Sequence, residues 1–200
     1  MASVESYPYL VALGANLNNA VAHNARMVVA AAHEIPGRVS AMSRLYRTLA
    51  FPEGSGPDFV NAVLATSCAL PPEAMLRALH AIEARHGRRR DRRWAARSLD
   101  LDLLGRGGIV RPHLDGLAHW IGLDPARQAR EAPGELILPH PRLQDRAFVL
   151  VPLTDVAPRW RHPLTGRSAT AMLAALPAAA RRQIRPLGAV DGVVNRKFGG

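Results

Sequence analysis

Two aspartates two residues apart are the clearest chemical feature of this sequence. Polar and apolar residues alternate strictly over residues 98–103, which predicts a strand. Side chains alternate faces along a strand, so Asp100 and Asp102 share one face and the neighbouring leucines the other. Their Cα atoms are roughly 6.5 Å apart, and two carboxylates this close repel each other unless a positive charge lies between them. Oxygen ligands favour Mg²⁺, so this face predicts a site where Asp100 and Asp102 hold two such ions.

A run of arginines comes directly before the acidic strand. Residues 85–97 include seven arginines. Metal-binding carboxylates beside phosphate-binding arginines indicate a site for a nucleotide polyphosphate. Lys197 is the only lysine and lies close to the C-terminus, so the chain lacks the lysine that a Walker A loop or a protein kinase needs. Arginines and metal ions must therefore bind any nucleoside triphosphate.

Composition limits the class of protein. A hydrophobic content of 48% indicates a folded chain, and 200 residues fit one domain or at most two small ones. The single cysteine, Cys68, excludes an intrachain disulfide framework and a cysteine-cluster zinc site. The N-terminus lacks a basic region followed by an apolar run, and no apolar run approaches about 18 residues. We therefore expect a cytoplasmic protein with no signal peptide and no membrane partner.

The order of the predicted elements indicates the fold class. The elements are a strand at 7–13, a helix capped by Asn18 or Asn19 that ends near Ile35, strands at 39–48 and 59–68, a helix at 71–87, and the acidic strand. This order, βαββαβ, is typical of an α+β fold with a ferredoxin-like antiparallel sheet and two helices on one face.

The second half of the chain is less regular. Residues 105–135 are rich in glycine and proline, so we expect an inserted excursion, with a short helix near 124–131. A short strand at 136–138 follows, then a rigid turn, a helix capped by Asp145 and a last helix at 168–176 capped by Ser168. We expect C-terminal helices in a single domain over residues 1–185 and a flexible tail over 186–200.

Several short motifs, in this order and spacing over residues 7–153, resemble those of one enzyme family. The chain resembles the 6-hydroxymethyl-7,8-dihydropterin pyrophosphokinases of folate biosynthesis. The motifs are Leu13-Gly14-Ala15-Asn16-Leu17, Tyr46-Arg47-Thr48, Pro57-Asp58-Phe59-Val60-Asn61-Ala62, Ile82-Glu83, Trp94 with Arg97-Ser98-Leu99-Asp100-Leu101-Asp102, Leu138-Pro139-His140-Pro141-Arg142, and Arg146-Ala147-Phe148-Val149.

The resemblance implies a transferase that moves the pyrophosphoryl group of ATP to the hydroxymethyl oxygen of the pterin and releases AMP. It implies that Asp100 and Asp102 hold two Mg²⁺ ions. Arg88, Arg90 and Arg97 would stabilise the phosphate oxygens through charge-assisted hydrogen bonds. Either one of the two aspartates or a metal ion would accept the hydroxyl proton.

The resemblance also implies two sets of substrate-binding residues. Phe59 and Phe148 match the pair that stacks on the pterin, Asn61 matches the amide that reads the pterin edge, and Thr48 supplies a further contact. The ATP-binding set is Glu83, Trp94, Arg97, His140, Arg142 and Arg146.

Two other functions remain alternatives. Ferredoxin-like folds include RNA-binding domains, and the formal net charge is +10. Two aspartates on the predicted sheet would repel RNA phosphates, however, so we expect small-molecule substrates, no nucleic-acid partner and a monomer. A metal-dependent phosphohydrolase could use the same carboxylate pair, and it would release phosphate from ATP without any pterin.

Overall fold

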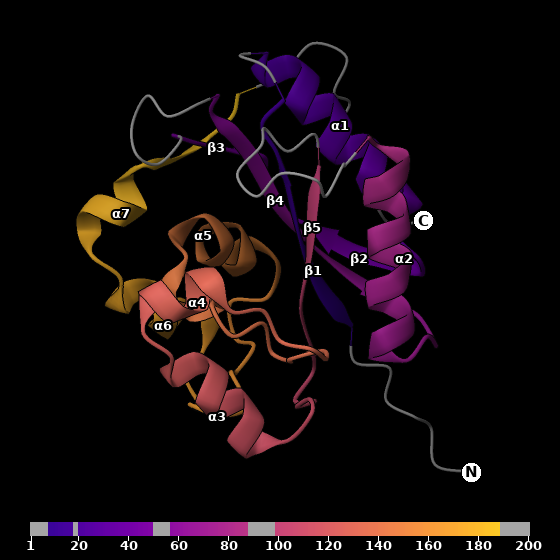
Figure 1. Ribbon diagram of the computed structural model, residues 1–200. Coiled ribbons are helices and arrows are strands. Elements are labelled where there is room, and N and C mark those ends of the chain that lie inside the picture. Colours follow the sequence, from indigo (N-terminus) through magenta and orange to yellow (C-terminus); the bar gives the residue numbers. More distant parts are fainter. Residues whose placement is uncertain (1–7, 18–19, 50–56, 88–98, 189–200) are drawn as a thin grey trace.

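An antiparallel sheet of six strands lies at the centre of the protein (Figure 1). The computed structural model describes residues 8–17, 20–49, 57–87 and 99–188. The strands follow the order β5-β1-β4-β3-β6 across the sheet, and β2 pairs with β4 beside β3. Their bounds are Tyr9–Ala15 (β1), Arg38–Met42 (β2), Tyr46–Thr48 (β3), Phe59–Ser67 (β4), Asp100–Arg106 (β5) and Ile184–Pro186 (β6).

Helices cover both faces of this sheet. Helices α1 and α2 lie on one face, and α5 and α6 lie on the other (Figure 1). The prediction of an α+β protein with an antiparallel sheet and added C-terminal helices is therefore confirmed. The helices are Val21–Glu34 (α1), Pro72–Arg85 (α2), Leu114–Gly122 (α3), Pro125–Arg130 (α4), Ala147–Val156 (α5), Ala169–Ala175 (α6) and Ala178–Arg182 (α7).

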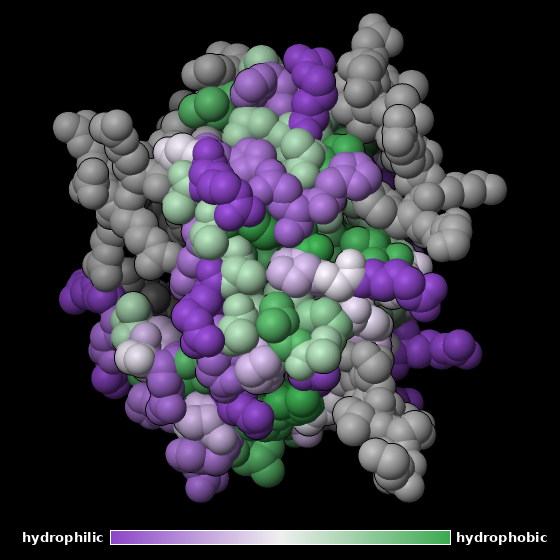
Figure 2. Space-filling model, turned by 90° about the vertical axis from the view of Figure 1, so that its right-hand side faces the viewer, coloured by the Kyte–Doolittle hydropathy of each residue, from purple (hydrophilic) through white to green (hydrophobic). Residues whose placement is uncertain are grey.

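Strand alternation divides the core into two main layers. Val11 and Leu13 of β1 pack towards α1 and α2, in a cluster that also includes Leu101. Leu10 of β1 points the other way and packs with Leu150 of α5. On the outer side of α1 and α2, hydrophilic and hydrophobic groups are interspersed (Figure 2), as expected for helices with one buried face. None of the helices in the described part of the chain is long and apolar enough to cross a membrane.

The strand predicted at 39–48 is in fact two strands. The break falls at Ser43, whose N–H donates to the carbonyl of Val63 at 2.8 Å. Its hydroxyl accepts a hydrogen bond from the Val63 N–H at 3.0 Å and donates one to the Arg44 carbonyl at 2.7 Å. A serine side chain that competes for backbone hydrogen bonds interrupts regular pairing. The two parts still both pair with β4.

Two predicted helix caps differ from the structure. Asn18 and Asn19 lie outside the described residues, and α1 has Ala20 at its N-cap without a side-chain hydrogen bond. Asp145 does not cap α5, because it belongs to the short 3₁₀ turn Leu143–Asp145 and Arg146 takes the N-cap position. The Ser168 cap of α6 is confirmed, since its hydroxyl accepts a hydrogen bond from the Ala171 N–H at 3.1 Å.

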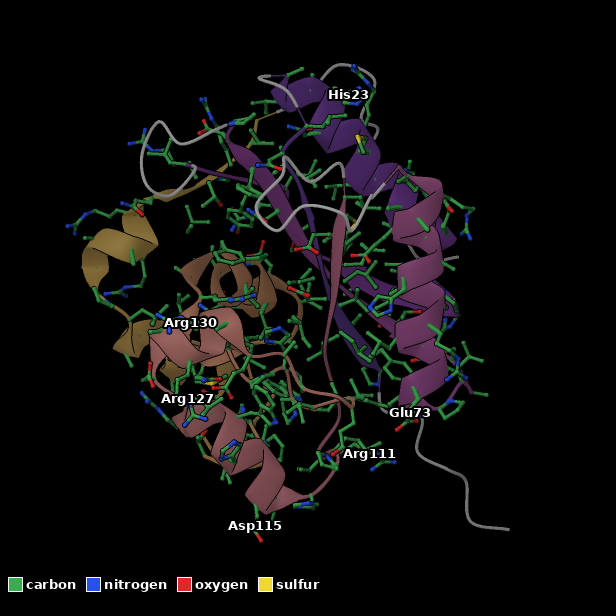
Figure 3. The ribbon with its side chains drawn as sticks, viewed as in Figure 1. His23, Glu73, Arg111, Asp115, Arg127 and Arg130 are labelled. Carbon is green, nitrogen blue, oxygen red and sulfur yellow. The ribbon has the colours of Figure 1, made fainter. Side chains whose placement is uncertain are left out.

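The segment 105–135 contains more helix than its composition predicts. The predicted helix near 124–131 is α4, whose N-terminus is capped by Asp124, but α3 was not predicted. The strand predicted at 136–138 is wrong, since only Leu138 pairs, in an isolated bridge with Arg111. The Arg111 side chain also reaches Glu73 at the start of α2, with Nε 3.3 Å from Oε1 (Figure 3). This ion pair joins the inserted segment to the main domain.

The C-terminal part of the domain extends further than expected. Strand β6 pairs with β3, and the Leu187 N–H donates to the carbonyl of Leu45 at 2.8 Å. Residues 184–187 therefore belong to the sheet edge, although the sequence places the start of a flexible tail at 186. Residues 189–200 lie outside the described part of the chain.

Gly37, between α1 and β2, must be glycine for steric reasons. Its φ is +103°, and a Cβ there would lie 2.5 Å from the carbonyl oxygen of Ser67. We expect Gly37→Ala to lower the free energy of unfolding by at least about 2 kcal/mol, measured by urea denaturation. Gly134→Ala is the control, because a Cβ at Gly134 meets no atom within 4 Å. Equal stabilities for the two variants would contradict this account of the turn.

Candidate active site

The aspartates of β5 lie on the sheet face that α5 partly covers. Both side chains are half-buried, and the leucines that flank them pack into the opposite layer. On the neighbouring strand β1, Asp100 pairs with Gly14 and Asp102 pairs with Ala12. Small residues opposite two carboxylates leave space above the sheet at this point.

Basic side chains approach the same face from the turn before α5. Arg146 Nη1 lies 3.5 Å from Asp102 Oδ2, and both side chains are partly buried. The His140 N–H donates to the carbonyl of Leu104 in β5 at 2.9 Å, which holds the turn against the strand. The charges of Asp102, Asp100, Arg146 and Arg142 all act on the His140 ring. The structure thus brings together five residues of the predicted site, namely Asp100, Asp102, His140, Arg142 and Arg146.

Hydrogen bonding fixes the tautomer of His140. Its Nδ1 accepts a hydrogen bond from the Arg142 N–H at 3.1 Å, so in the neutral ring the proton is on Nε2. Burial lowers the pKa of His140, and this outweighs the opposing effect of Asp102. At neutral pH the ring is therefore an uncharged hydrogen-bond donor through Nε2.

A polar pair lies beside the carboxylates on the same face. Asn61 of β4 is 6% exposed, and its Nδ2 donates to Thr48 Oγ1 at 2.9 Å. Asn61 pairs across the sheet with Gly14, the residue that also pairs with Asp100. A Cβ at Gly14 would lie 3.1 Å from Asn61 Oδ1. Because Gly14 has no side chain, the space between the Asp100 carboxylate and the Asn61 amide stays open.

The two predicted aromatic residues lie on different elements. Phe59 pairs with Thr48 at the start of β4, whereas Phe148 lies in the first turn of α5. Phe148 is 37% exposed, and Arg146 Cζ lies 5.6 Å from its ring centroid. An exposed ring beside a cation is available to stack on a flat ligand.

Glu83 supports the acidic strand from the other side. It lies near the end of α2, is 1% exposed, and its Oε1 accepts a hydrogen bond from the Leu101 N–H at 2.8 Å. Leu101 lies between the two aspartates, in the strand at one end of the sheet order. Glu83 therefore holds the backbone that carries the carboxylates, and the ATP contact implied by the resemblance remains a prediction.

Four predicted site residues lie outside the described part of the chain, and two residues that shape the site were not predicted. Arg88, Arg90, Trp94 and Arg97 lie outside the described residues. Asp155, which binds Tyr46, was not predicted, because an aspartate near a helix end has no distinctive local pattern. The spacing role of Gly14 was also missed, because it depends on a cross-strand neighbour.

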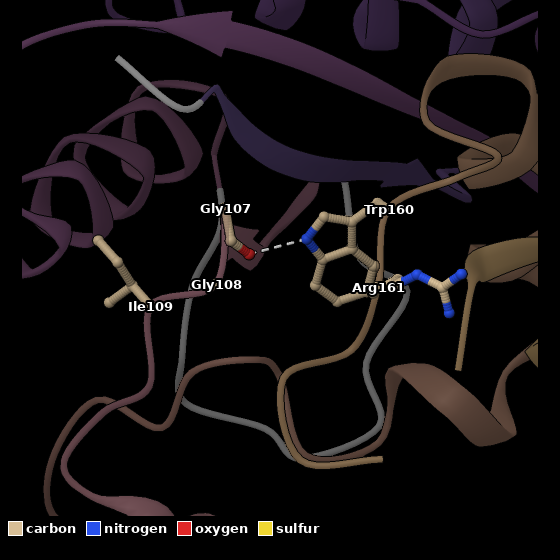
Figure 4. A pocket seen from close by; sticks show the side chains of 5 residues that line it. All are labelled: Gly107, Gly108, Ile109, Trp160 and Arg161. Atoms are coloured by element: carbon tan, nitrogen blue, oxygen red, sulfur yellow. Dashed lines mark hydrogen bonds between the residues drawn. The ribbon is translucent and has the colours of Figure 1, made fainter. Parts of the chain in front are cut away.

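An open pocket of about 530 Å³ lies elsewhere, just beyond the C-terminal end of β5 (Figure 4). It is lined by Gly107, Gly108, Ile109, Trp160 and Arg161. Trp160 Nε1 donates to the Gly107 carbonyl at 2.8 Å, so the indole N–H is already satisfied. None of the predicted site residues in the described part of the chain lines this pocket.

Fold and site together define a class. This is an α+β protein whose sheet presents a carboxylate pair beside arginine and histidine side chains, an arrangement suited to a polyphosphate bound with a metal ion. Residues 10–158 match the family described as 7,8-dihydro-6-hydroxymethylpterin-pyrophosphokinase. The chain belongs to this family.

Curated relatives agree with this assignment, and solved structures show a similar fold. A 2-amino-4-hydroxy-6-hydroxymethyldihydropteridine pyrophosphokinase of Pseudomonas aeruginosa is 40% identical over 140 residues, covering 70% of this chain and 74% of that protein. The enzyme of the same name from a Synechocystis strain is 34% identical over 160 residues, covering 80% and 71%. Crystalline Plasmodium falciparum HPPK-DHPS has a similar fold, with a TM-score of 0.60 at 12% identity. The structural match covers 84% of this chain and 44% of that longer one.

Glu83 offers a test of the strand support. Glu83→Ala would leave the Leu101 N–H buried without this acceptor, so we expect it to reduce the free energy of unfolding by about 1–3 kcal/mol in urea denaturation. Glu83→Gln keeps an oxygen acceptor of similar size and is expected to be the more stable of the two variants. If the two variants were equally stable, the hydrogen bond to Leu101 would not be the supporting interaction.

Proposed function

We propose that this protein transfers the pyrophosphoryl group of ATP to 6-hydroxymethyl-7,8-dihydropterin and releases AMP, a step of folate biosynthesis. The observation that carries the proposal is the shared sheet face of β5 and β4. There the Asp100–Asp102 pair, next to Arg146 and His140, adjoins the Asn61 amide. A site for charged phosphates thus adjoins a site for a flat polar ring, as a transfer between two such substrates requires.

The carboxylate pair fits Mg²⁺. Asp100 and Asp102 are half-buried on one face, and among the described residues no third His, Cys, Asp or Glu joins them in a metal-binding cluster. Protein-bound Mg²⁺ commonly uses one or two carboxylates and completes its coordination with water and substrate phosphates. We propose that these two aspartates hold two Mg²⁺ ions, which when bound neutralise charge on the phosphates.

The basic side chains would bind the phosphates of ATP. Arg146 and Arg142 offer guanidinium groups that match phosphate oxygens in shape and charge, and the neutral His140 ring donates from Nε2. Arg88, Arg90, Arg97 and Trp94 complete the proposed ATP and catalytic set from outside the described part of the chain. Charge-assisted hydrogen bonds that strengthen as charge develops on the phosphate oxygens lower the barrier to transfer.

The pterin would lie beside the carboxylates. Phe148 and Phe59 would stack on its two ring faces, and the Asn61 amide, oriented by Thr48, would hydrogen-bond its polar edge. Gly14 forms the floor between this amide and Asp100. In this position the hydroxymethyl oxygen would face the phosphates. As it forms its bond to phosphorus and the bond to AMP breaks, one of the two aspartates would take up its proton.

We also infer the finer features of the chain. A ferredoxin-like core is supported by the strand order β5-β1-β4 followed by β2 and β3, when β2 and β3 are taken as one interrupted strand. We propose that residues 1–185, together with the remaining sheet-edge residues 186 and 187, act as a single domain and that the enzyme works as a cytoplasmic monomer.

Product analysis tests the proposed function. We expect AMP to form from ATP only when Mg²⁺ and 6-hydroxymethyl-7,8-dihydropterin are both present, and Asp102→Ala to reduce its rate at least about a hundredfold. Asp115→Ala, which changes an exposed aspartate in the first turn of α3 (Figure 3, bottom), is the matched control and should keep wild-type activity. Release of free phosphate without the pterin would favour a phosphohydrolase, and salt-sensitive RNA binding without turnover would favour the RNA-binding alternative.

Gly14 tests the pterin site specifically. Because a Cβ there would press on Asn61 Oδ1, we expect Gly14→Ala to raise KM for the pterin by about tenfold or more. Gly108→Ala adds the same methyl group where no atom lies within 4 Å and should leave both KM values unchanged. An unaltered pterin KM in Gly14→Ala would argue that Asn61 does not read the substrate.

A further inference from the structure

A carboxylate at the far end of α5 is bound to the strand that leads into the site. Asp155 Oδ2 accepts a hydrogen bond from Tyr46 Oη at 2.8 Å. The same carboxylate accepts hydrogen bonds from Arg44, at 3.3 Å from the backbone N–H, 3.1 Å from Nε and 3.1 Å from Nη2. Four donors from one short segment therefore converge on a single side chain of α5.

Tyr46 connects this carboxylate to the proposed pterin site. It is 2% exposed and pairs directly with Asn61 across β3 and β4. Its ring shares a small apolar cluster with Ala147, in the first turn of α5 beside Phe148, and with Ile184 of β6. One buried residue thus contacts the strand pair that carries Thr48 and Asn61 and the helix that carries Phe148.

The two residues that donate hydrogen bonds to Asp155 contribute unequally. The Arg44 side chain is 64% exposed, so its ion pair is weakened by water and salt. The Tyr46 hydroxyl belongs to a buried side chain, and hydrogen bonds to an ionised acceptor are stronger when shielded. Burial raises the pKa of Tyr46 to about 12, aided by Asp155, so the phenol stays protonated as donor. Burial alone would raise the pKa of Asp155, but hydrogen bonds from Arg44 and Tyr46 outweigh it and leave this pKa below its ordinary value.

We propose that Tyr46 and Asp155 are positioning residues that set the distance between the two walls of the pterin site. One wall is Phe148 on α5, and the other is the Thr48–Asn61 pair on β3 and β4. Neither residue belongs to the proposed substrate-binding set, so both would act through the residues that they hold. The inference rests on the proposed function, since it assigns these walls to the pterin. It implies that breaking the Tyr46–Asp155 hydrogen bond weakens binding of the pterin and leaves binding of ATP unchanged.

Single-atom and isosteric variants test the proposal. Tyr46→Phe removes only the hydroxyl and keeps the packed ring, and we expect KM for the pterin to rise about three- to tenfold while KM for MgATP and kcat change less than twofold. Asp155→Ala should give the same pattern. Asp155→Asn keeps an oxygen acceptor for the Tyr46 hydroxyl, so it should retain a pterin KM close to that of the wild type. The double variant Tyr46→Phe, Asp155→Ala should be no worse than either single variant, because both remove one interaction.

Arg44→Gln is the matched control, since it removes the exposed ion pair and leaves the Tyr46 hydrogen bond in place. We expect its pterin KM to stay within twofold of the wild type, with thermal unfolding midpoints recorded for every variant. A Tyr46→Phe enzyme with a lower midpoint but an unchanged pterin KM would overturn the inference, as would equal increases in both KM values. Wild-type protein that forms no AMP with the pterin would overturn the proposed function and the inference with it, so the two failures are distinguishable.

Discussion

Side-chain alternation along β5 is the constraint on which the site depends. One face of the strand must bury leucines against α1 and α2, and this places both aspartates on the other face. A slip of one residue would turn the carboxylates into the core and the leucines towards the ligands. The pairing with β1 and the hydrogen bond from Leu101 to Glu83 prevent this slip from both sides. Leu101, between the aspartates, thus fixes the register of the strand that carries them.

Antiparallel pairing places the remaining groups in a row across the sheet. Asp100, Gly14, Asn61 and Tyr46 are consecutive cross-strand partners on β5, β1, β4 and β3. Neighbouring strands lie about 4.8 Å apart, so the row extends roughly 14 Å across the sheet. Each residue type fits its place: the carboxylate lies on the edge strand, the glycine leaves space beside it, the amide bonds to Thr48, and the phenol bonds to Asp155 of α5. The chemistry is distributed over strands that are distant in sequence.

The sequence predicts well those features that depend on local periodicity. The acidic strand, α2, the Ser168 cap and the antiparallel α+β class follow from alternation, helical spacing and capping chemistry, and the structure has them. Predictions failed where a contact between residues distant in sequence determines the local structure. Ser43 divides the strand at 39–48 by forming hydrogen bonds with β4. In the segment 136–138, only Leu138 pairs, in an isolated bridge with Arg111. The Asp155 contact joins residues 109 positions apart, which no local pattern reveals.

The segment after the family match completes the edge of the site. The match ends at residue 158, yet β6 pairs with β3 and places Ile184 opposite Thr48. Without a partner, the outer edge of a strand only three residues long would expose its backbone groups and move freely. On the same side, Met172 of α6 packs into the layer that contains Leu150 and Leu153 of α5. Residues that carry none of the chemistry therefore hold both walls of the proposed pterin site, which explains why the catalytic motifs alone do not define the folded unit.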